Sequence, residues 1–142
     1  MLALTTIGVL GTGFCYKTIV FTCNKTINLI SEIGNNQYET LNLLLLKSDI
    51  GKKIVRTRQL ILDINVDKDS IQFAIHDLDE IIETINVLLQ HFLDCKTKHE
   101  QLYFNTWRTM DISMYIEKLT LYIEIYNHRF RDLVDIMSII KN

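Results

Sequence analysis

Few residues of this 142-residue chain are spaced for chemistry. The four histidines are scattered over three segments, and none belongs to an HExxH pair or to another metal-ligand spacing: His76, His91, His99 and His128. The sequence contains no GxxxxGK[ST], GxSxG or GxGxxG motif, so no phosphate loop or nucleophile elbow is expected. A di-iron helical bundle needs carboxylates that point into the core and a Glu-x-x-His motif, and the sequence shows neither. We therefore expect no enzyme, no metal ion and no cofactor.

The cysteines and the net charge narrow the class of protein further. Cys15, Cys23 and Cys95 are an odd number and form no CxxC pair. That favours reduced thiols in an intracellular protein over a disulfide framework or a zinc site. The formal net charge of −2 leaves no electrostatic footprint for nucleic acid.

Charge is unevenly distributed along the chain. Residues 47–58 hold five basic residues against Asp49 alone, and residues 67–94 hold seven acids against Lys68. Helices formed by the two segments could lie side by side with complementary charges. Alternatively, the basic cluster could contact anionic lipid headgroups, at about 1 kcal/mol per basic residue. Both interpretations hold if the resting bundle masks the patch, and the candidate headgroup residues are Lys47, Lys52, Lys53, Arg56 and Arg58.

The first sixteen residues carry no charge and include three glycines. A helix that is apolar on every side is buried in protein or inserted in lipid. From residue 1 to residue 23 the only charge is Lys17, and a spanning helix needs about 20 mostly apolar residues. Lys17 makes this segment a mediocre permanent anchor. It fits better as the first helix of a bundle that is later released into lipid.

Apolar spacing predicts four helices, over about 2–33, 38–64, 69–94 and 110–140, in a single domain of residues 1–142. The third predicted helix, 69–94, has an apolar stripe whose members recur at alternating steps of four and three: Ile71, Ile75, Leu78, Ile82, Ile85, Leu89 and Phe92. Three further apolar residues flank this stripe: Ala74, Ile81 and Leu88. The acids Asp77, Asp79, Glu80 and Glu83 are expected on its solvated side. In the first predicted helix, 2–33, the expected core stripe includes Val20, Cys23, Ile27 and Ile30.

The second predicted helix contains Gly51, where a bend is possible. Such stripes must bury against one another, which predicts an all-α, antiparallel four-helix bundle with an apolar first helix. The connection between the third and fourth helices, about 95–109, is longer than the others. We expect its aromatic residues to cap the open end of the bundle: Tyr103, Phe104 and Trp107.

The chain resembles the N-terminal four-helix bundle of the mixed-lineage kinase domain-like pseudokinases, the fungal HeLo and HeLo-like domains, and the coiled-coil domains of some plant immune receptors. The resemblance covers about residues 1–137. It rests on the apolar, glycine-containing first helix and on three segments of similar pattern: IHDLDEIIETINVLLQHF, DCKTKHEQLYFNTWR and MYIEKLTLYIEIYNHRFRDL.

The resemblance implies a role in cell death or immunity, such as necroptosis. In that family the bundle oligomerises, binds anionic lipid and permeabilises membranes, under the control of a regulatory kinase or NTPase domain or partner. Carried to this chain, it implies a cytoplasmic protein that moves to a membrane on activation, with the basic cluster on lipid headgroups. The candidates for membrane insertion are Ile7, Leu10, Phe14 and Phe21.

Two other functions remain open from the sequence. The chain could be a structural or assembly protein that its N-terminal helix anchors permanently in a membrane. It could also be a soluble adaptor that binds partner helices through apolar residues of the fourth helix outside its core stripe, which are Leu121, Ile136 and Ile139. Solubility without detergent and binding to anionic vesicles separate the three.

Overall fold

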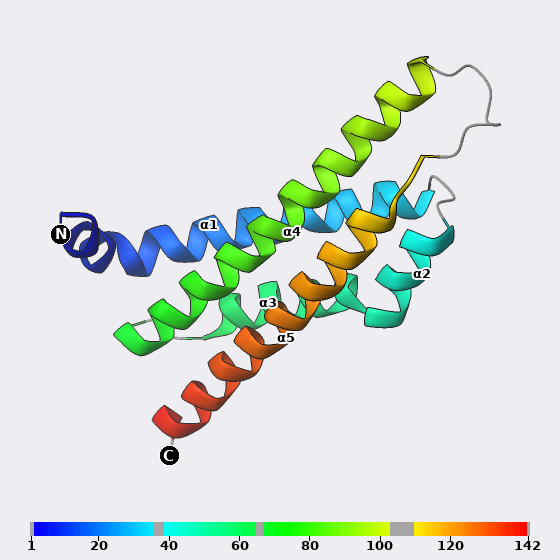
Figure 1. Cartoon of the computed structure of the whole chain (residues 1–142). Helices are drawn as coiled ribbons and strands as arrows, with labels where there is room; N and C mark the ends of the chain where they lie inside the picture. Colours follow the sequence, from blue (N-terminus) through cyan, green and yellow to red (C-terminus); the bar gives the residue numbers. More distant parts are fainter. Residues whose placement is uncertain (1, 36–38, 65–66, 103–109, 142) are drawn as a thin grey trace.

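The computed structural model describes residues 2–35, 39–64, 67–102 and 110–141, with the backbone alone for residues 2–16, 39 and 141. Within this part the protein is all-α, as predicted, with five helices and no strand. The helices, shown in Figure 1, are α1 (Leu2–Asn35), α2 (Glu39–Ser48), α3 (Ile50–Asp63), α4 (Asp69–Leu102) and α5 (Ser113–Lys141).

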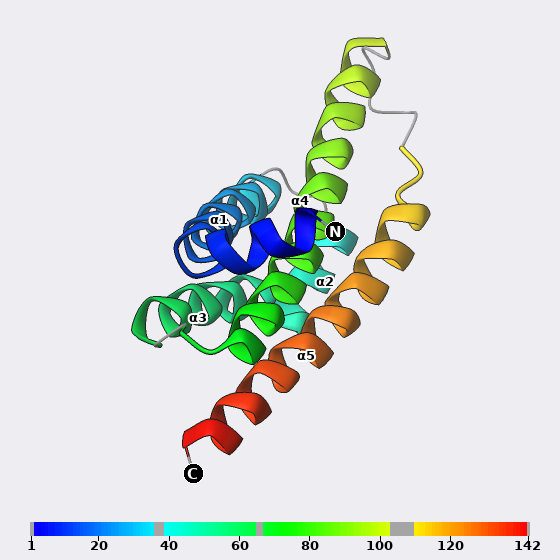
Figure 2. The same ribbon diagram turned by 90° about the vertical axis from the view of Figure 1, so that its left-hand side faces the viewer.

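α4 is the central helix of the bundle. It packs against α1 on one side and α5 on the other, and Figure 2 shows it between them. α4 and α5 run antiparallel, because Tyr115 contacts His91 near one end of the pair and Arg129 contacts Asp77 near the other. The stripe predicted over 69–94 is confirmed, since all seven of its members and the three flanking residues are buried.

α3 packs on α1 and is joined to α5 by side-chain hydrogen bonds. The guanidinium of Arg58 donates to Oδ1 of Asn24 on α1 at 2.6 Å, and Gly51 lies opposite Ile30, so α1 and α3 are antiparallel. On the other flank, the hydroxyl of Tyr126 on α5 donates to the carbonyl of Lys53 at 3.0 Å. Tyr126 is buried, so its hydroxyl needs a hydrogen-bond partner, and the Lys53 carbonyl supplies one that joins α5 to α3.

The segment predicted as one helix over 38–64 is two helices, α2 and α3. The break is at Asp49, whose φ of 55° and ψ of 28° are left-handed, and not at Gly51, which has no positive φ. Aspartate tolerates this region better than most residues because its side chain is short and polar. The helical hydrogen bonds resume at once, since Lys53 N–H donates to the Asp49 carbonyl at 3.0 Å.

α4 ends later and α5 begins later than predicted. α4 continues eight residues past Asp94, to Leu102, and Lys96 contacts Glu100 one turn later at 3.7 Å. α5 begins at Ser113, where the Asp111 carboxylate accepts hydrogen bonds from the Ser113 backbone and hydroxyl. These bonds lower the pKa of Asp111. The predicted aromatic cap at residues 103, 104 and 107 lies outside the described residues.

The buried face of α1 differs from the predicted stripe. Ile27 and Ile30 are only half-buried, whereas Leu29 and Ile33 are buried in their place. Two threonines also lie in the core, with each hydroxyl donating to the carbonyl four residues earlier: Thr22 to Thr18 and Thr26 to Thr22, both at 2.9 Å. A pattern of apolar residues overlooks such threonines, because their hydroxyls are satisfied locally within the helix.

Candidate functional site

A groove of about 420 Å³ runs along the outer junction of α1 and α3. Its apolar lining consists of Ile27 and Ile30 from α1 and Val55 from α3. Two basic side chains from successive turns of α3, Lys52 and Arg56, line it as well. The remaining lining residues are Ser31 and Gly51.

Local sequence explains how α3 presents these residues. Ile50, Ile54, Thr57 and Ile61 face the core, so the positions between them point outward or sideways. Lys52 and Arg56 are both exposed, and within the described part of the chain neither makes a hydrogen bond or an ion pair. α3 carries four basic residues against one acid. The groove therefore combines an apolar floor with unneutralised positive charge.

The structure divides the five predicted headgroup residues into three groups. Lys52 and Arg56 share the groove. Lys53 and Arg58 are half-buried and bind neighbouring helices: Nζ of Lys53 donates to Oδ1 of Asn127 on α5 at 3.1 Å, and Arg58 bonds to α1. Lys47 lies exposed in the last turn of α2, away from the groove lining. The segment is thus uniformly basic in sequence, but only two of its five cations lie together in the groove.

The sequence left open that helices formed by residues 47–58 and 67–94 lie side by side with complementary charges. The helix packing does not favour this arrangement. α3 packs mainly on α1, and α4 packs mainly on α1 and α5. The two ion pairs between described side chains join Lys96 to Glu100 and Arg129 to Glu80. Neither involves the basic segment.

Of the predicted insertion residues, only Phe21 has a described side chain. It is 66% exposed on α1. Ile7, Leu10 and Phe14 belong to α1 by their backbone, and their side chains lie outside the described set. Phe21 does not line the α1–α3 groove.

The exposed face of α1 adds two residues that the sequence interpretation did not assign. Lys17 and Lys25 are exposed one turn before and one turn after Phe21. Residues four apart lie next to each other on a helix surface, so the three form one stripe. Their spacing is the signal that could have identified them, since an aromatic ring flanked by lysines is typical of helices that lie at a membrane surface.

Two ionisable side chains, Asp79 on α4 and Cys23 on α1, are withdrawn from solvent. Asp79 on α4, expected on the solvated side, is half-buried, and its Oδ1 has no hydrogen-bond partner within the described part of the chain. Burial raises the pKa of the Asp79 carboxyl, while the Thr22 hydroxyl and His76 act in the opposite direction. Cys23 is fully buried, and burial raises the pKa of its thiol to about 12. That thiol stays protonated and unreactive at neutral pH.

No protein-family model, curated protein or solved structure matches this chain. Among the described side chains, no cluster of three histidine, cysteine, aspartate or glutamate residues could hold a metal ion. Among the described residues there is also no helix long and apolar enough to cross a membrane. The side chains of the uncharged segment 1–16 are not among them.

Proposed function

We propose that this protein is a membrane-binding helical domain whose α1–α3 face contacts anionic lipid. The observation that carries the proposal is the α1–α3 groove, in which Lys52 and Arg56 lie beside an apolar floor without a neutralising partner in the described chain. Anionic amphiphiles present the complementary combination of charged oxygens and hydrocarbon. The exposed stripe of Lys17, Phe21 and Lys25 adds two positive charges and an aromatic ring on α1, one of the two helices that line the groove.

The arrangement that we propose is an antiparallel bundle of the HeLo type, in which α2 and α3 together take the place of one helix. On a membrane, copies of the chain associate, and the N-terminal part of α1 leaves the bundle and inserts. The outcome is membrane permeabilisation in a cell-death or immune response. The apolar composition of residues 1–16 supports insertion, since this stretch contains no charge.

Vesicle binding tests the lipid-contacting surface. Purified protein is mixed with vesicles of phosphatidylcholine, with or without phosphatidylserine, and bound protein is measured by co-sedimentation. We expect binding only to the anionic vesicles. Lys52→Gln/Arg56→Gln should weaken it about 30-fold, because each basic residue near such a surface contributes about 1 kcal/mol.

The matched control is Lys98→Gln/Arg131→Gln, which removes one exposed lysine and one exposed arginine from α4 and α5. It should leave vesicle binding within a few-fold of the wild type. Equal losses from the two double variants would show that overall charge, and not the α1–α3 face, governs binding. A chain that binds no vesicle would instead support the adaptor function.

Permeabilisation is tested separately, by release of a trapped dye from the same anionic vesicles. Leu10→Glu should abolish release while leaving the circular dichroism spectrum and the initial vesicle binding unchanged. Release that persists in Leu10→Glu would contradict insertion by this part of α1. A protein recovered only with detergent, already embedded in membranes, would support the permanent-anchor alternative.

A further inference from the structure

A thiol, an imidazole and a phenol meet where α4 and α5 pack together. Cys95 and His91 lie one turn apart on α4, and the Cys95 sulfur is 3.8 Å from each ring nitrogen of His91. The hydroxyl of Tyr115, from α5, lies 2.8 Å from Nδ1 of His91. Cys95 is half-buried and His91 is exposed, so a reagent in solution can reach both. A nucleophile beside a base that a third group orients is the arrangement used in covalent catalysis.

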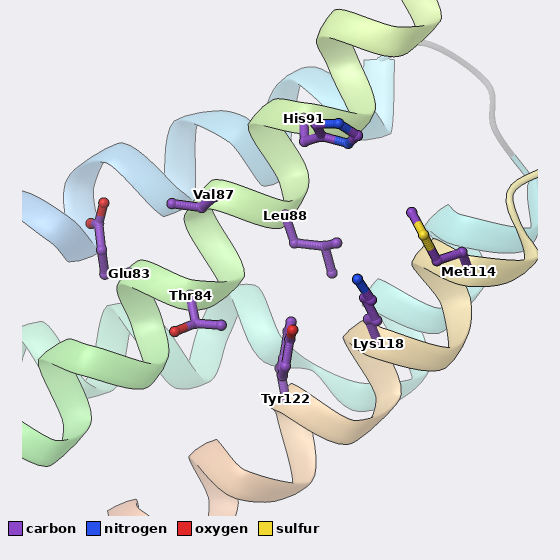
Figure 3. Close-up of a pocket in the computed structure, with 8 residues that line it drawn as sticks. All are labelled: Glu83, Thr84, Val87, Leu88, His91, Met114, Lys118 and Tyr122. Carbon is purple, nitrogen blue, oxygen red and sulfur yellow. The ribbon is translucent and has the colours of Figure 1, made fainter.

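The same histidine lines the end of a groove of about 490 Å³ between α4 and α5. Figure 3 shows Val87 and Leu88 of α4 on one side and Met114 and Tyr122 of α5 on the other. Val87 is 59% exposed and Met114 is 44% exposed, so apolar surface is left open along the groove. The charged residues that line it are Glu83 and Lys118. The groove therefore reaches the imidazole that lies beside the Cys95 thiol, and its apolar lining suits a reactant with a hydrocarbon tail.

We propose that Cys95 is an S-acylation site, at which the chain accepts a long acyl group from an acyl thioester and holds its hydrocarbon tail in the α4–α5 groove. The class of acyl donor is a long-chain acyl-coenzyme A. This inference goes beyond the proposed lipid-contacting surface and does not depend on it, because it uses different helices and different residues.

The transfer is balanced without an oxidant or a metal. In the proposed step the Nδ1–H tautomer of His91 donates to the Tyr115 oxygen, and Nε2 takes the proton of the Cys95 thiol. The thiolate then attacks the carbonyl carbon of the donor thioester. The tetrahedral intermediate collapses by breaking the donor C–S bond, and the departing coenzyme A thiolate takes the proton from His91. The products are a Cys95 thioester and free coenzyme A.

The surroundings of Tyr115 and Cys23 agree with Cys95 as the acylation site. Burial raises the pKa of Tyr115 to about 12, with a further contribution from Cys95, so its hydroxyl stays neutral and remains a hydrogen-bond partner for the imidazole. The other cysteine with a described side chain, Cys23, is fully buried, and burial raises the pKa of its thiol to about 12. Selectivity for Cys95 over Cys23 therefore follows from access and from the His91 neighbour.

The experiment uses the full chain and palmitoyl-coenzyme A, with acetyl-coenzyme A as the short-chain comparison. Transfer is measured by intact mass, by release with neutral hydroxylamine, and by peptide mapping. We expect the palmitoyl group on Cys95, none on Cys23, and faster transfer from the long-chain donor. Cys95→Ser should lose the modification. His91→Gln should slow it about a hundredfold, a typical contribution of a general base.

A groove variant separates the acyl site from an ordinary reactive thiol. Val87→Glu places a charge in the groove at an exposed position, so it should slow palmitoyl transfer at least tenfold and leave acetyl transfer unchanged. Melting curves of each variant must match the wild type. Modification that is equal in His91→Gln, that favours acetyl-coenzyme A, or that maps to Cys23 would overturn the inference. Vesicle binding of Cys95→Ser without acyl donor should be normal, which keeps this test independent of the lipid-contacting surface.

Discussion

Asp79 shows how a single position can work against the stability of the fold. Its carboxylate is half-buried against α1, and one of its oxygens has no hydrogen-bond partner within the described chain. Burial disfavours the ionised form of a carboxyl group and therefore raises its pKa. Because the folded pKa exceeds the unfolded one, folding is favoured when Asp79 is protonated. That contribution is fully present below the ordinary pKa of 3.8 and is lost as the pH rises through the folded pKa.

Asp79→Asn should therefore raise the melting temperature at pH 7, because the amide has the same shape and no charge to desolvate. The advantage over the wild type should shrink as the pH falls towards 3.8, where the wild-type carboxyl is itself protonated. Thermal melts of both proteins between neutral and acidic pH measure the difference. A variant that is less stable at pH 7, or a gap that does not change with pH, would contradict the burial of this charge.

The α2–α3 junction is the clearest example at the level of elements. A single left-handed residue, Asp49, ends α2 and starts α3. The hydrogen bonds on either side continue almost unbroken: Asp49 N–H donates to the Leu46 carbonyl at 3.1 Å, and Lys53 N–H donates to Asp49. The break turns α3 so that Ile50, Ile54 and Ile61 reach the core. Lys52 and Arg56 are thereby left at the groove with α1.

Asp49→Gly distinguishes this junction from a continuous helix. Glycine adopts positive φ without steric cost, so the variant should raise the free energy of unfolding by about 0.5–1 kcal/mol. In an uninterrupted helix the same glycine would lower stability by a similar amount. Denaturant melts give the sign, and Asp49→Val serves as the opposite control, because a β-branched residue is strained in the left-handed region.

At the level of the whole molecule, charge is segregated between helices. The net charge of the chain is only −2. α3 nevertheless has four basic residues against one acid, and α4 has seven acids against two lysines. α3 is placed against α1, with α4 running between α1 and α5 (Figure 2), so the basic helix forms part of a distinct face. A chain with little net charge can thus still present a basic surface to a membrane.

The salt dependence of vesicle binding tests whether the basic face of the molecule contributes to that binding. Raising the ionic strength from about 0.1 M to about 1 M shortens the screening length from about 10 Å to about 3 Å. Binding of the wild type to phosphatidylserine vesicles should weaken strongly over this range, whereas the weaker binding of Lys52→Gln/Arg56→Gln should change less. Binding that is indifferent to salt would mean that apolar contacts alone hold the chain on the vesicle.

The sequence predicted much of the helical framework. The stripe of α4 repeats with the helical period, and burial follows that period because side chains three and four apart lie on one face. The same reasoning failed in α1, where Thr22 and Thr26 take core positions that apolar spacing could not reveal. It also predicted one helix over 38–64 with a possible bend at Gly51, because the left-handed tolerance of Asp49 is not visible in a hydrophobic pattern.

By itself, then, the sequence determined the all-α class and the basic density of residues 47–58, since each depends on residues close together in the chain. Tertiary structure alone decided that Lys52 and Arg56 share a groove with Ile27 and Ile30, whereas Lys53 and Arg58 are tied to neighbouring helices. It also brought Tyr115 to His91 across the α4–α5 contact. The reason is physical: helical periodicity fixes the face that a residue occupies, but the partner of that face depends on how whole helices pack.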